Sequence, residues 1–82
     1  MKTDCAAQET YEISPRFRKL IEERIERLEQ DAARDEADVA RLDDIEHIRR
    51  QLRLVAVERA EALRMRLFLD RSRTRERTLF DR

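Results

Sequence analysis

The stretch that decides the fold covers residues 14–42 and reads SPRFRKLIEERIERLEQDAARDEADVARL. Apolar residues recur through it at alternating steps of four and three, if Asp35 is counted as one position of the series. They are Ile21, Ile25, Leu28, Ala32, Val39 and Leu42. This spacing predicts an amphipathic helix with a heptad seam. Ser14 and Pro15 predict its start, because serine caps a first helical turn and proline is tolerated at the first helical position.

The residues after Leu42 continue the apolar pattern, first with a shifted phase and then as a broader stripe. They are Ile45, Ile48, Leu52, Val55, Ala56, Ala60, Leu63 and Leu67. Two successive steps of three shift the heptad, so one uninterrupted coiled coil is not the simplest interpretation. Ala, Leu, Arg and Glu, all good helix formers, dominate the chain. The sequence therefore predicts an all-α fold: an antiparallel helical hairpin or coiled coil over residues 14–69. A continuous helix that dimerises along its length is the alternative.

Two acidic stretches are candidates for the turn of this hairpin, residues 35–38 and the pair Asp43–Asp44. We expect the turn near residues 34–38, because Asp35 also interrupts the seam and aspartate caps helix starts well. The second helix would then be about 50 Å long against about 29 Å for the first. Its overhanging part would leave an apolar side bare. We expect partner binding there, through Leu63, Leu67 and Phe68.

The two ends of the chain have different compositions. Residues 1–13 are polar and mixed, and we expect them to form an N-terminal arm that is ordered only if something covers it. Residues 70–82 form an Arg-rich C-terminal arm. Its candidate partner-binding residues are Arg71, Arg73, Arg75, Arg77 and Phe80. Arginine makes bidentate contacts to phosphate or carboxylate, so the arm predicts a nucleic-acid or acidic-protein partner. The alternative is a solvated tail that balances the acidic half.

Charge is segregated along the chain although the formal net charge is zero. Residues 1–47 hold 8 basic and 14 acidic side chains, a net of −6, and residues 48–82 hold 11 basic and 5 acidic, a net of +6. An antiparallel arrangement lays the acidic half against the basic half, whereas a parallel pair of chains places like charges together. The segregation therefore favours an antiparallel arrangement, within one chain or between two.

Composition argues against several classes of protein. There is no glycine for a phosphate-binding loop, a single cysteine, and no apolar run near the 20 residues of a membrane span. The first residues lack the apolar core of a secretory signal. We expect a cytoplasmic, non-enzymatic protein without a cofactor. Asp44 and His47 are three residues apart and could join Glu22, Glu26 or Glu29 in a metal site, although a solvated helix face is the simpler interpretation.

One short motif resembles a known family. Asp35, Asp38 and Ala40 fit an Asp-x-x-Asp-x-Ala pattern, which is similar to the tip of the DksA-like family of transcription factors. That resemblance implies an antiparallel helical hairpin whose acidic tip, with Asp35 and Asp38, enters the secondary channel of RNA polymerase. It covers six residues, and the family's four-cysteine zinc module is absent from this sequence.

These patterns lead to one functional expectation and two alternatives. We expect a small helical interaction protein that self-associates or docks on a larger assembly, and regulates or stabilises that assembly by binding. Its partner is expected to be a protein, with formation of a homo-oligomer. The first alternative is a nucleic-acid-associated regulator: a small transcription factor or a phage-type inhibitor. The second is a metal-binding helical bundle.

Overall fold

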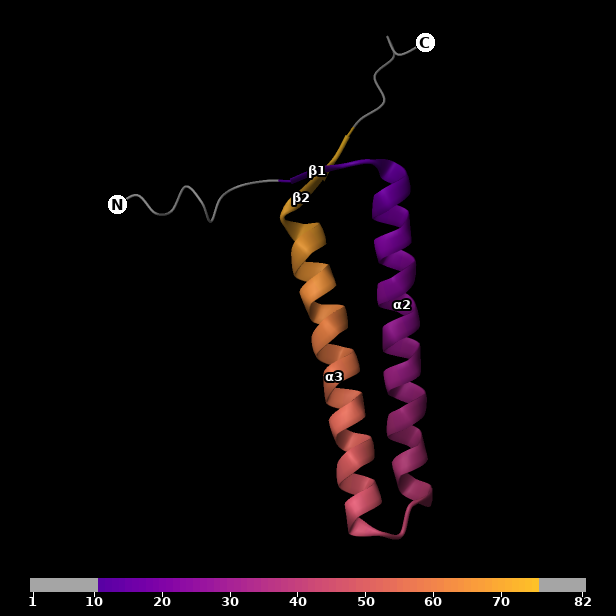
Figure 1. Ribbon diagram of the computed structural model, residues 1–82. Coiled ribbons are helices and arrows are strands. Elements are labelled where there is room, and N and C mark those ends of the chain that lie inside the picture. Colours follow the sequence, from indigo (N-terminus) through magenta and orange to yellow (C-terminus); the bar gives the residue numbers. More distant parts are fainter. Residues whose placement is uncertain (1–10, 76–82) are drawn as a thin grey trace, which may run out of the picture.

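A computed structural model describes residues 11–75 as two long antiparallel helices that lie side by side (Figure 1). Helix α2 spans Pro15–Asp38 and helix α3 spans Ile45–Asp70. A short 3₁₀ turn, η1 (Val39–Arg41), and residues 42–44 connect them. Two three-residue strands, β1 (Tyr11–Ile13) and β2 (Ser72–Thr74), lie at the open end of the hairpin. The predicted all-α helical hairpin is confirmed.

Each helix begins at a side-chain cap. The Ser14 hydroxyl accepts a hydrogen bond from the backbone N–H of Phe17 at 3.1 Å, and Pro15 takes the first helical position as predicted. The Asp44 carboxylate accepts from the backbone N–H of His47 at 3.2 Å. Both capping residues have extended backbone angles, as residues that precede a helix do. The two caps fix where the chain enters α2 and where it re-enters helix after the turn.

The turn lies later than residues 34–38, so the predicted position is wrong. Helix α2 continues through Asp35 to Asp38, and the chain reverses between residues 39 and 44. Asp35 stays inside the helix at a half-buried seam position, opposite polar residues of α3. The Gln51 side-chain amide donates to the backbone carbonyl of Asp35 at 2.9 Å. The second candidate for the turn, Asp43–Asp44, is the one that the structure uses.

The later turn makes the helices nearly equal, with 24 residues in α2 and 26 in α3. At about 1.5 Å per residue they are about 36 Å and 39 Å long. The predicted overhang of the second helix therefore does not exist. Leu63, Leu67 and Phe68 lie instead on a part of α3 that is packed beside the first half of α2, as the contact of Phe17 with Phe68 and the approach of Arg24 to Glu61 show.

The core is a single seam between the helices. Heptad positions of both helices point into it, and the open end of the hairpin contains most of the buried side chains. The main cluster consists of Ile13, Ile25, Ala62 and Leu69, with Ile21, Leu28, Met65 and Phe68 packed against it. Nearer the turn, Ala32 and Val55 are buried. The half-buried positions there include apolar Val39, Leu42 and Ile48 and polar Asp35, Gln51 and Glu58.

The segments that flank the helices pair with each other in part. Strand β1 lies parallel to β2, with Tyr11 opposite Ser72 and Ile13 opposite Thr74. The backbone N–H of Tyr11 donates to the Arg71 carbonyl at 3.1 Å, and that of Arg75 to the Ile13 carbonyl at 2.7 Å. Residues 11–13 and 72–74 are therefore not free arms. They close the open end of the hairpin and bury Ile13.

The acidic and basic halves of the chain lie side by side, as the charge segregation predicts. Arg59 of α3 pairs with Glu36 of α2 at 2.8 Å, and Arg66 pairs with Glu29 at 2.7 Å. Arg24 of α2 and Glu61 of α3 approach to 4.0 Å with the opposite polarity. Within residues 11–75, neither helix is long and apolar enough to cross a membrane.

Candidate interaction surface

One lateral side of α3, about 120° around the helix from the face that α2 covers, has an apolar stripe of its own. Its members follow one another at steps of four, four, three and four, and all of them are exposed. They are Leu52, Ala56, Ala60, Leu63 and Leu67, which we call the outer stripe. At about 100° per residue they fall within about 80° of the helix surface and extend over about 22 Å. Leu63 is 55% exposed and Leu67 is 52% exposed. Both predicted binding leucines thus belong to a continuous exposed stripe.

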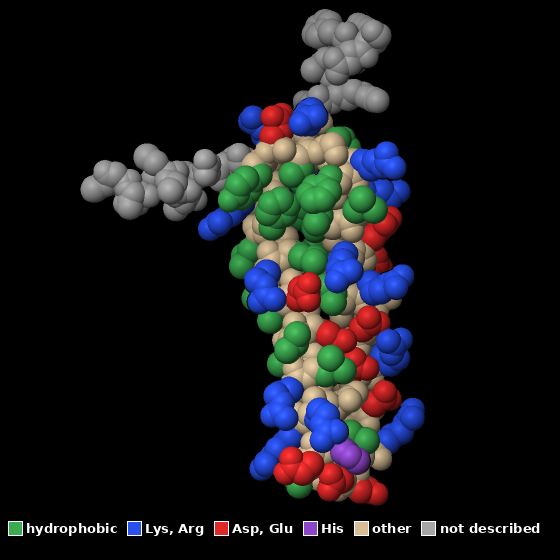
Figure 2. All heavy atoms as spheres, in the orientation of Figure 1, with side chains coloured by type: hydrophobic (Ala, Val, Ile, Leu, Met, Phe, Trp, Pro, Cys, Tyr) green, Lys and Arg blue, Asp and Glu red, His purple; other side chains and the backbone are tan. Residues whose placement is uncertain are grey.

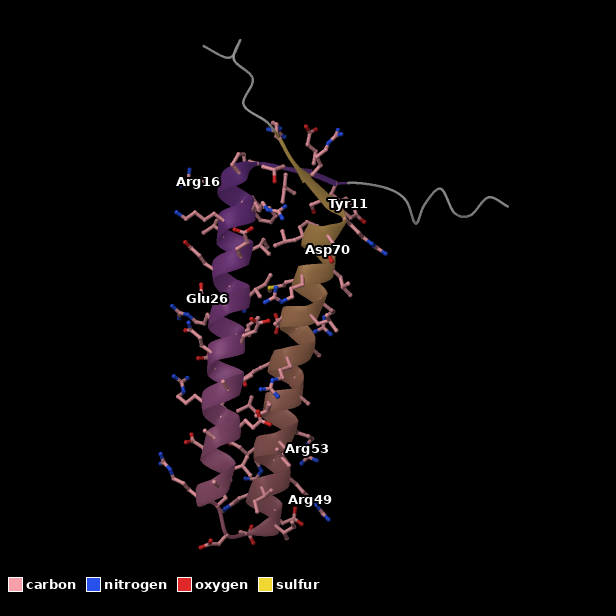
Figure 3. The ribbon with its side chains drawn as sticks, turned by 180° about the vertical axis from the view of Figure 1, so that it is seen from behind. Tyr11, Arg16, Glu26, Arg49, Arg53 and Asp70 are labelled. Carbon is pink, nitrogen blue, oxygen red and sulfur yellow. The ribbon has the colours of Figure 1, made fainter. Side chains whose placement is uncertain are left out.

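Arginine side chains border the outer stripe on both sides. On the side nearer α2, Arg59 and Arg66 are paired with glutamates of that helix. On the other side Arg53 and Arg64 form no ion pair with any residue between 11 and 75. Figure 3 shows Arg53 extending from α3 on the side away from α2. The stripe is therefore an apolar surface with an uncompensated positive border.

Phe68 is not part of this stripe, because it belongs to an aromatic cluster at the open end. Its ring stacks on Tyr11 with centroids 5.5 Å apart and meets Phe17 edge-on at 6.4 Å. Phe68 is half-buried, whereas Tyr11 and Phe17 are each 43% exposed. Hydrophobic side chains gather at this end in Figure 2. The expectation that Phe68 stands on a bare overhang is wrong, because β1 places Tyr11 over its ring.

A shallow groove of about 320 Å³ lies beside the aromatic cluster. It is bounded by Phe17 and Ile21 of α2 and by Glu61, Arg64, Met65 and Phe68 of α3. Arg64 thus lies between the groove and the outer stripe. The groove extends the apolar surface of α3 around the open end of the hairpin.

The arginines of the predicted C-terminal arm are in different surroundings. Arg71 follows α3 directly, Arg73 lies in β2, and both are exposed without an ion pair in the described part of the chain. The Arg75 guanidinium is 3.9 Å from the Glu12 carboxylate. Arg77 and Phe80 lie outside the described residues. The strands therefore hold Arg71 and Arg73 at the open end, next to the end of the outer stripe.

Of the two predicted tip residues, Asp38 directly precedes the turn and Asp35 lies inside α2. Asp35 is half-buried in the seam, and Asp38 is the last residue of α2, with its carboxylate 3.8 Å from the Arg41 guanidinium. Asp35 faces Glu58, whose Oε1 is shielded from solvent and has no hydrogen-bond partner among the described residues. Burial raises the pKa of Glu58 above its ordinary value, and the negative charges of Asp35 and Asp31 raise it further. This part of the seam is electrostatically unfavourable.

The candidate metal ligands Asp44 and His47 have a structural role. Asp44 caps α3, and its carboxylate is 3.9 Å from His47 Nδ1 on an exposed surface. Of the glutamates expected to face them, Glu29 pairs with Arg66 near the other end of α3. No group of three or more potential metal ligands comes together between residues 11 and 75. Helix capping accounts for Asp44, and the cap uses only the backbone N–H of His47.

Comparisons with protein-family models, with curated proteins and with solved structures find no match to this chain. Sequence reasoning found Leu63 and Leu67 and missed that Leu52, Ala56 and Ala60 continue the same stripe. The signal was present in the broadening of the apolar pattern after Val55, because a helix with apolar residues on two sides has one more face than a single neighbour covers.

Proposed function

We propose that this protein is a non-enzymatic helical interaction protein that binds a partner protein through the outer stripe of α3. One observation carries the proposal: α3 has two apolar stripes about 120° apart around the helix, and α2 covers only one of them. The inner stripe contains the buried residues Val55, Ala62 and Leu69, and the outer stripe is exposed along its length. A second helix packed on the outer stripe would remove its leucines from water, which favours binding.

The form of the hairpin suits action by binding. Its two helices, sealed at one end by β1 and β2, hold the outer stripe straight over about 22 Å. A partner helix therefore meets a preformed surface, so little ordering of α3 opposes association. Occupancy of the stripe would regulate or stabilise the assembly to which the partner belongs.

The test compares capture of host proteins by the parent chain and by two matched variants. Leu63→Glu combined with Leu67→Glu places two charges on the outer stripe. Leu20→Glu places a charge at an exposed apolar position of α2, where the side chain is 57% exposed. We expect a protein that the parent and Leu20→Glu retain and that the double variant loses, and the same difference with that protein in purified form. Equal retention by all three chains, each confirmed helical by circular dichroism, overturns the proposal.

A nucleic-acid-associated regulator is the second candidate function, favoured by unpaired arginines. Arg50, Arg53, Arg64, Arg71 and Arg73 form no ion pairs within the described residues. Phosphate contacts release counterions, so each one adds about 0.9 to the log–log slope of affinity against salt on duplex DNA. Binding to a random-sequence duplex with a slope of about 3 or more would support this candidate, and absence of binding at 50 mM salt would remove it.

The same apolar surface could bind a second copy of this chain in place of another protein. Sedimentation velocity on the purified parent at micromolar concentration separates the two cases. A monomer leaves the stripe available for a partner. A dimer that the Leu63→Glu and Leu67→Glu changes dissociate would assign the stripe to a second copy of the chain.

A further inference from the structure

We propose that the occupant of the outer stripe is an acidic amphipathic helix of another protein. The inference rests on the proposed function, because it names the chemistry of the partner that binds the same surface. Three observations support it: the sign of the charges around the stripe, the way α2 binds the inner stripe, and the size of the residues in its middle.

The middle of α3, between the terminal acidic residues Glu46 and Asp70, carries mostly positive charge. Between residues 47 and 69 it contains six arginines and only two acidic residues, Glu58 and Glu61. Glu58 is half-buried in the seam and Glu61 lies 4.0 Å from Arg24 of α2, so both acidic groups are on the α2 side. The outer side consequently presents positive charge alone over this range. A partner with carboxylates beside its apolar residues compensates Arg53 and Arg64, whereas a basic partner is repelled.

Helix α2 shows how an acidic helix fits α3. Its apolar residues pack into the inner stripe, and its glutamates reach the arginines at the edge of that stripe. The two closest pairs are Glu29 with Arg66 and Glu36 with Arg59, at 2.7 Å and 2.8 Å. Their donors on α3 are seven residues apart, one heptad, so the same side chains repeat along the interface. An external helix on the outer stripe would repeat this arrangement, with Arg53 and Arg64 as its donors.

The middle of the outer stripe is made of small residues. Ala56 and Ala60 lie between Leu52 on one side and Leu63 and Leu67 on the other. Small side chains allow two helix axes to approach, and the flanking leucines fill the space on either side of the contact. A membrane surface rewards bulky apolar side chains that insert deeply, and two alanines among five residues offer little for insertion. The two alanines favour the close approach of a helix, and because Leu54 and Val57 are also exposed, vesicle binding is the direct test against lipid.

A second copy of this chain is a poorer occupant than an acidic helix. Pairing two outer stripes brings Arg53 and Arg64 of one copy toward the same residues of the other, and like charges across a helix pair destabilise it. The outer side of α2 offers no comparable apolar stripe, since Phe17 and Leu20 are the only large apolar residues of α2 that are strongly exposed. Neither combination of surfaces matches both the leucines and the arginines of the outer stripe.

The experiment uses two designed amphipathic peptides and the full chain. Both peptides carry the same leucine seam. One has glutamate and the other lysine at the positions that flank the seam. Binding of each fluorescently labelled peptide is measured by anisotropy at 50 mM and 300 mM salt. We expect the acidic peptide to bind about ten-fold or more tightly than the basic one at 50 mM salt, and the difference to shrink at 300 mM as exposed charges are screened.

Three variants of the full chain locate the binding site. Leu63→Glu with Leu67→Glu is expected to reduce affinity for the acidic peptide by about 100-fold, the loss of two buried leucines. Arg53→Gln with Arg64→Gln should reduce it by about 2- to 20-fold, because each exposed ion pair contributes a factor of up to about five. Arg16→Gln with Arg27→Gln removes two exposed arginines of α2 and should leave it unchanged. A peptide that displaced α2 would bind the inner stripe and would be insensitive to changes at Leu63 and Leu67. Loss of binding in the Leu63→Glu, Leu67→Glu variant therefore also excludes displacement of α2.

The possible failures separate this inference from the proposed function. Equal binding of both peptides, abolished by the stripe variant, leaves the outer stripe as a docking site and overturns the acidic partner. If the chain binds neither peptide, the inference of an acidic helical partner is wrong. The proposed function is then still tested by the capture of host proteins. Self-association lost in the stripe variant, or binding to vesicles of anionic lipid lost in it, assigns the surface to a second copy or to a membrane and overturns the inference.

Discussion

The ring of Tyr11 stacks on that of Phe68 with centroids 5.5 Å apart and planes inclined by 22°. Tyr11 is the first residue of β1 and Phe68 belongs to the last turn of α3, so the contact joins the two ends of the described chain. Phe17 meets Phe68 edge-on and adds the first turn of α2 to the same cluster. These rings and the paired strands close the hairpin at the end opposite its turn.

Replacing Tyr11 by alanine should destabilise the fold although Tyr11 precedes both helices. A stacked aromatic pair contributes about 0.5 to 1.5 kcal/mol beyond the area it buries, so we expect a loss of about 1 to 2 kcal/mol in the free energy of unfolding. Urea denaturation followed by circular dichroism measures it. Leu20→Ala, an exposed apolar change on α2, is the control and should stay within about 0.5 kcal/mol of the parent. An equal effect of the two changes would show that β1 does not hold the hairpin closed.

Replacing Asp44 by alanine tests the position of the turn. Loss of a capping aspartate costs about 1 kcal/mol, and we expect that loss in thermal or urea unfolding. Asp35→Ala should cost nothing or stabilise, because Asp35 is inside α2 and faces Glu58 rather than capping a helix. If Asp35→Ala were instead more destabilising than Asp44→Ala, the turn would lie at residues 34–38.

The position of the turn shows what the sequence could and could not predict. The start of α2 followed from Ser14 and Pro15, because caps are local. The heptad pattern and the charge segregation predicted the antiparallel pairing. Asp35 was misinterpreted because a polar residue in a seam can indicate either a break or a polar contact across it. Only the position of Gln51 on α3 distinguishes them, and that depends on how the two helices align.

The free energy of unfolding should depend on pH in a way that reflects the ionisation of Glu58. Because burial and neighbouring carboxylates raise its pKa above 4.5 in the folded chain, the folded state holds this proton more tightly than the unfolded state does. Its contribution to stability is therefore present at pH values below 4.5 and is lost as the pH rises through the raised pKa. Glu58→Gln should be more stable than the parent at pH 7, with a difference that shrinks toward pH 4. A difference independent of pH would contradict the assignment.

The ion pair of Glu29 and Arg66 should contribute little to the free energy of unfolding. A double-mutant cycle should still detect it as a coupling energy. Both side chains are largely exposed, so we expect a coupling of about 0.2 to 1 kcal/mol in a double-mutant cycle, smaller at high salt. Exchanging the charges, Glu29→Arg with Arg66→Glu, should recover most of what either single reversal loses. Additive losses in the double variant would show that these residues are not paired.

The candidate surface was predictable in part. The sequence predicts Leu63 and Leu67 as binding residues, but for a reason that the structure replaces: they are exposed because they lie outside the face of α3 that α2 covers, and not because α3 overhangs. The sequence places Phe68 with them because all three lie on the expected overhang of the second helix. Its aromatic partners, Tyr11 and Phe17, come from segments whose approach depends on the pairing of β1 with β2. Three-residue strands carry too little pattern to be predicted from sequence.

Photo-crosslinking from the outer stripe tests the central claim most directly. A photoreactive phenylalanine analogue is placed at position 63 in one chain and at position 20, on α2, in another, and each is irradiated with host extract. We predict that position 63 forms an adduct with a segment of one other protein, that this segment is an acidic amphipathic helix, and that position 20 forms none with it. Adducts of equal yield from both positions, or adducts of position 63 with this chain alone, would contradict the claim that α3 binds a partner protein.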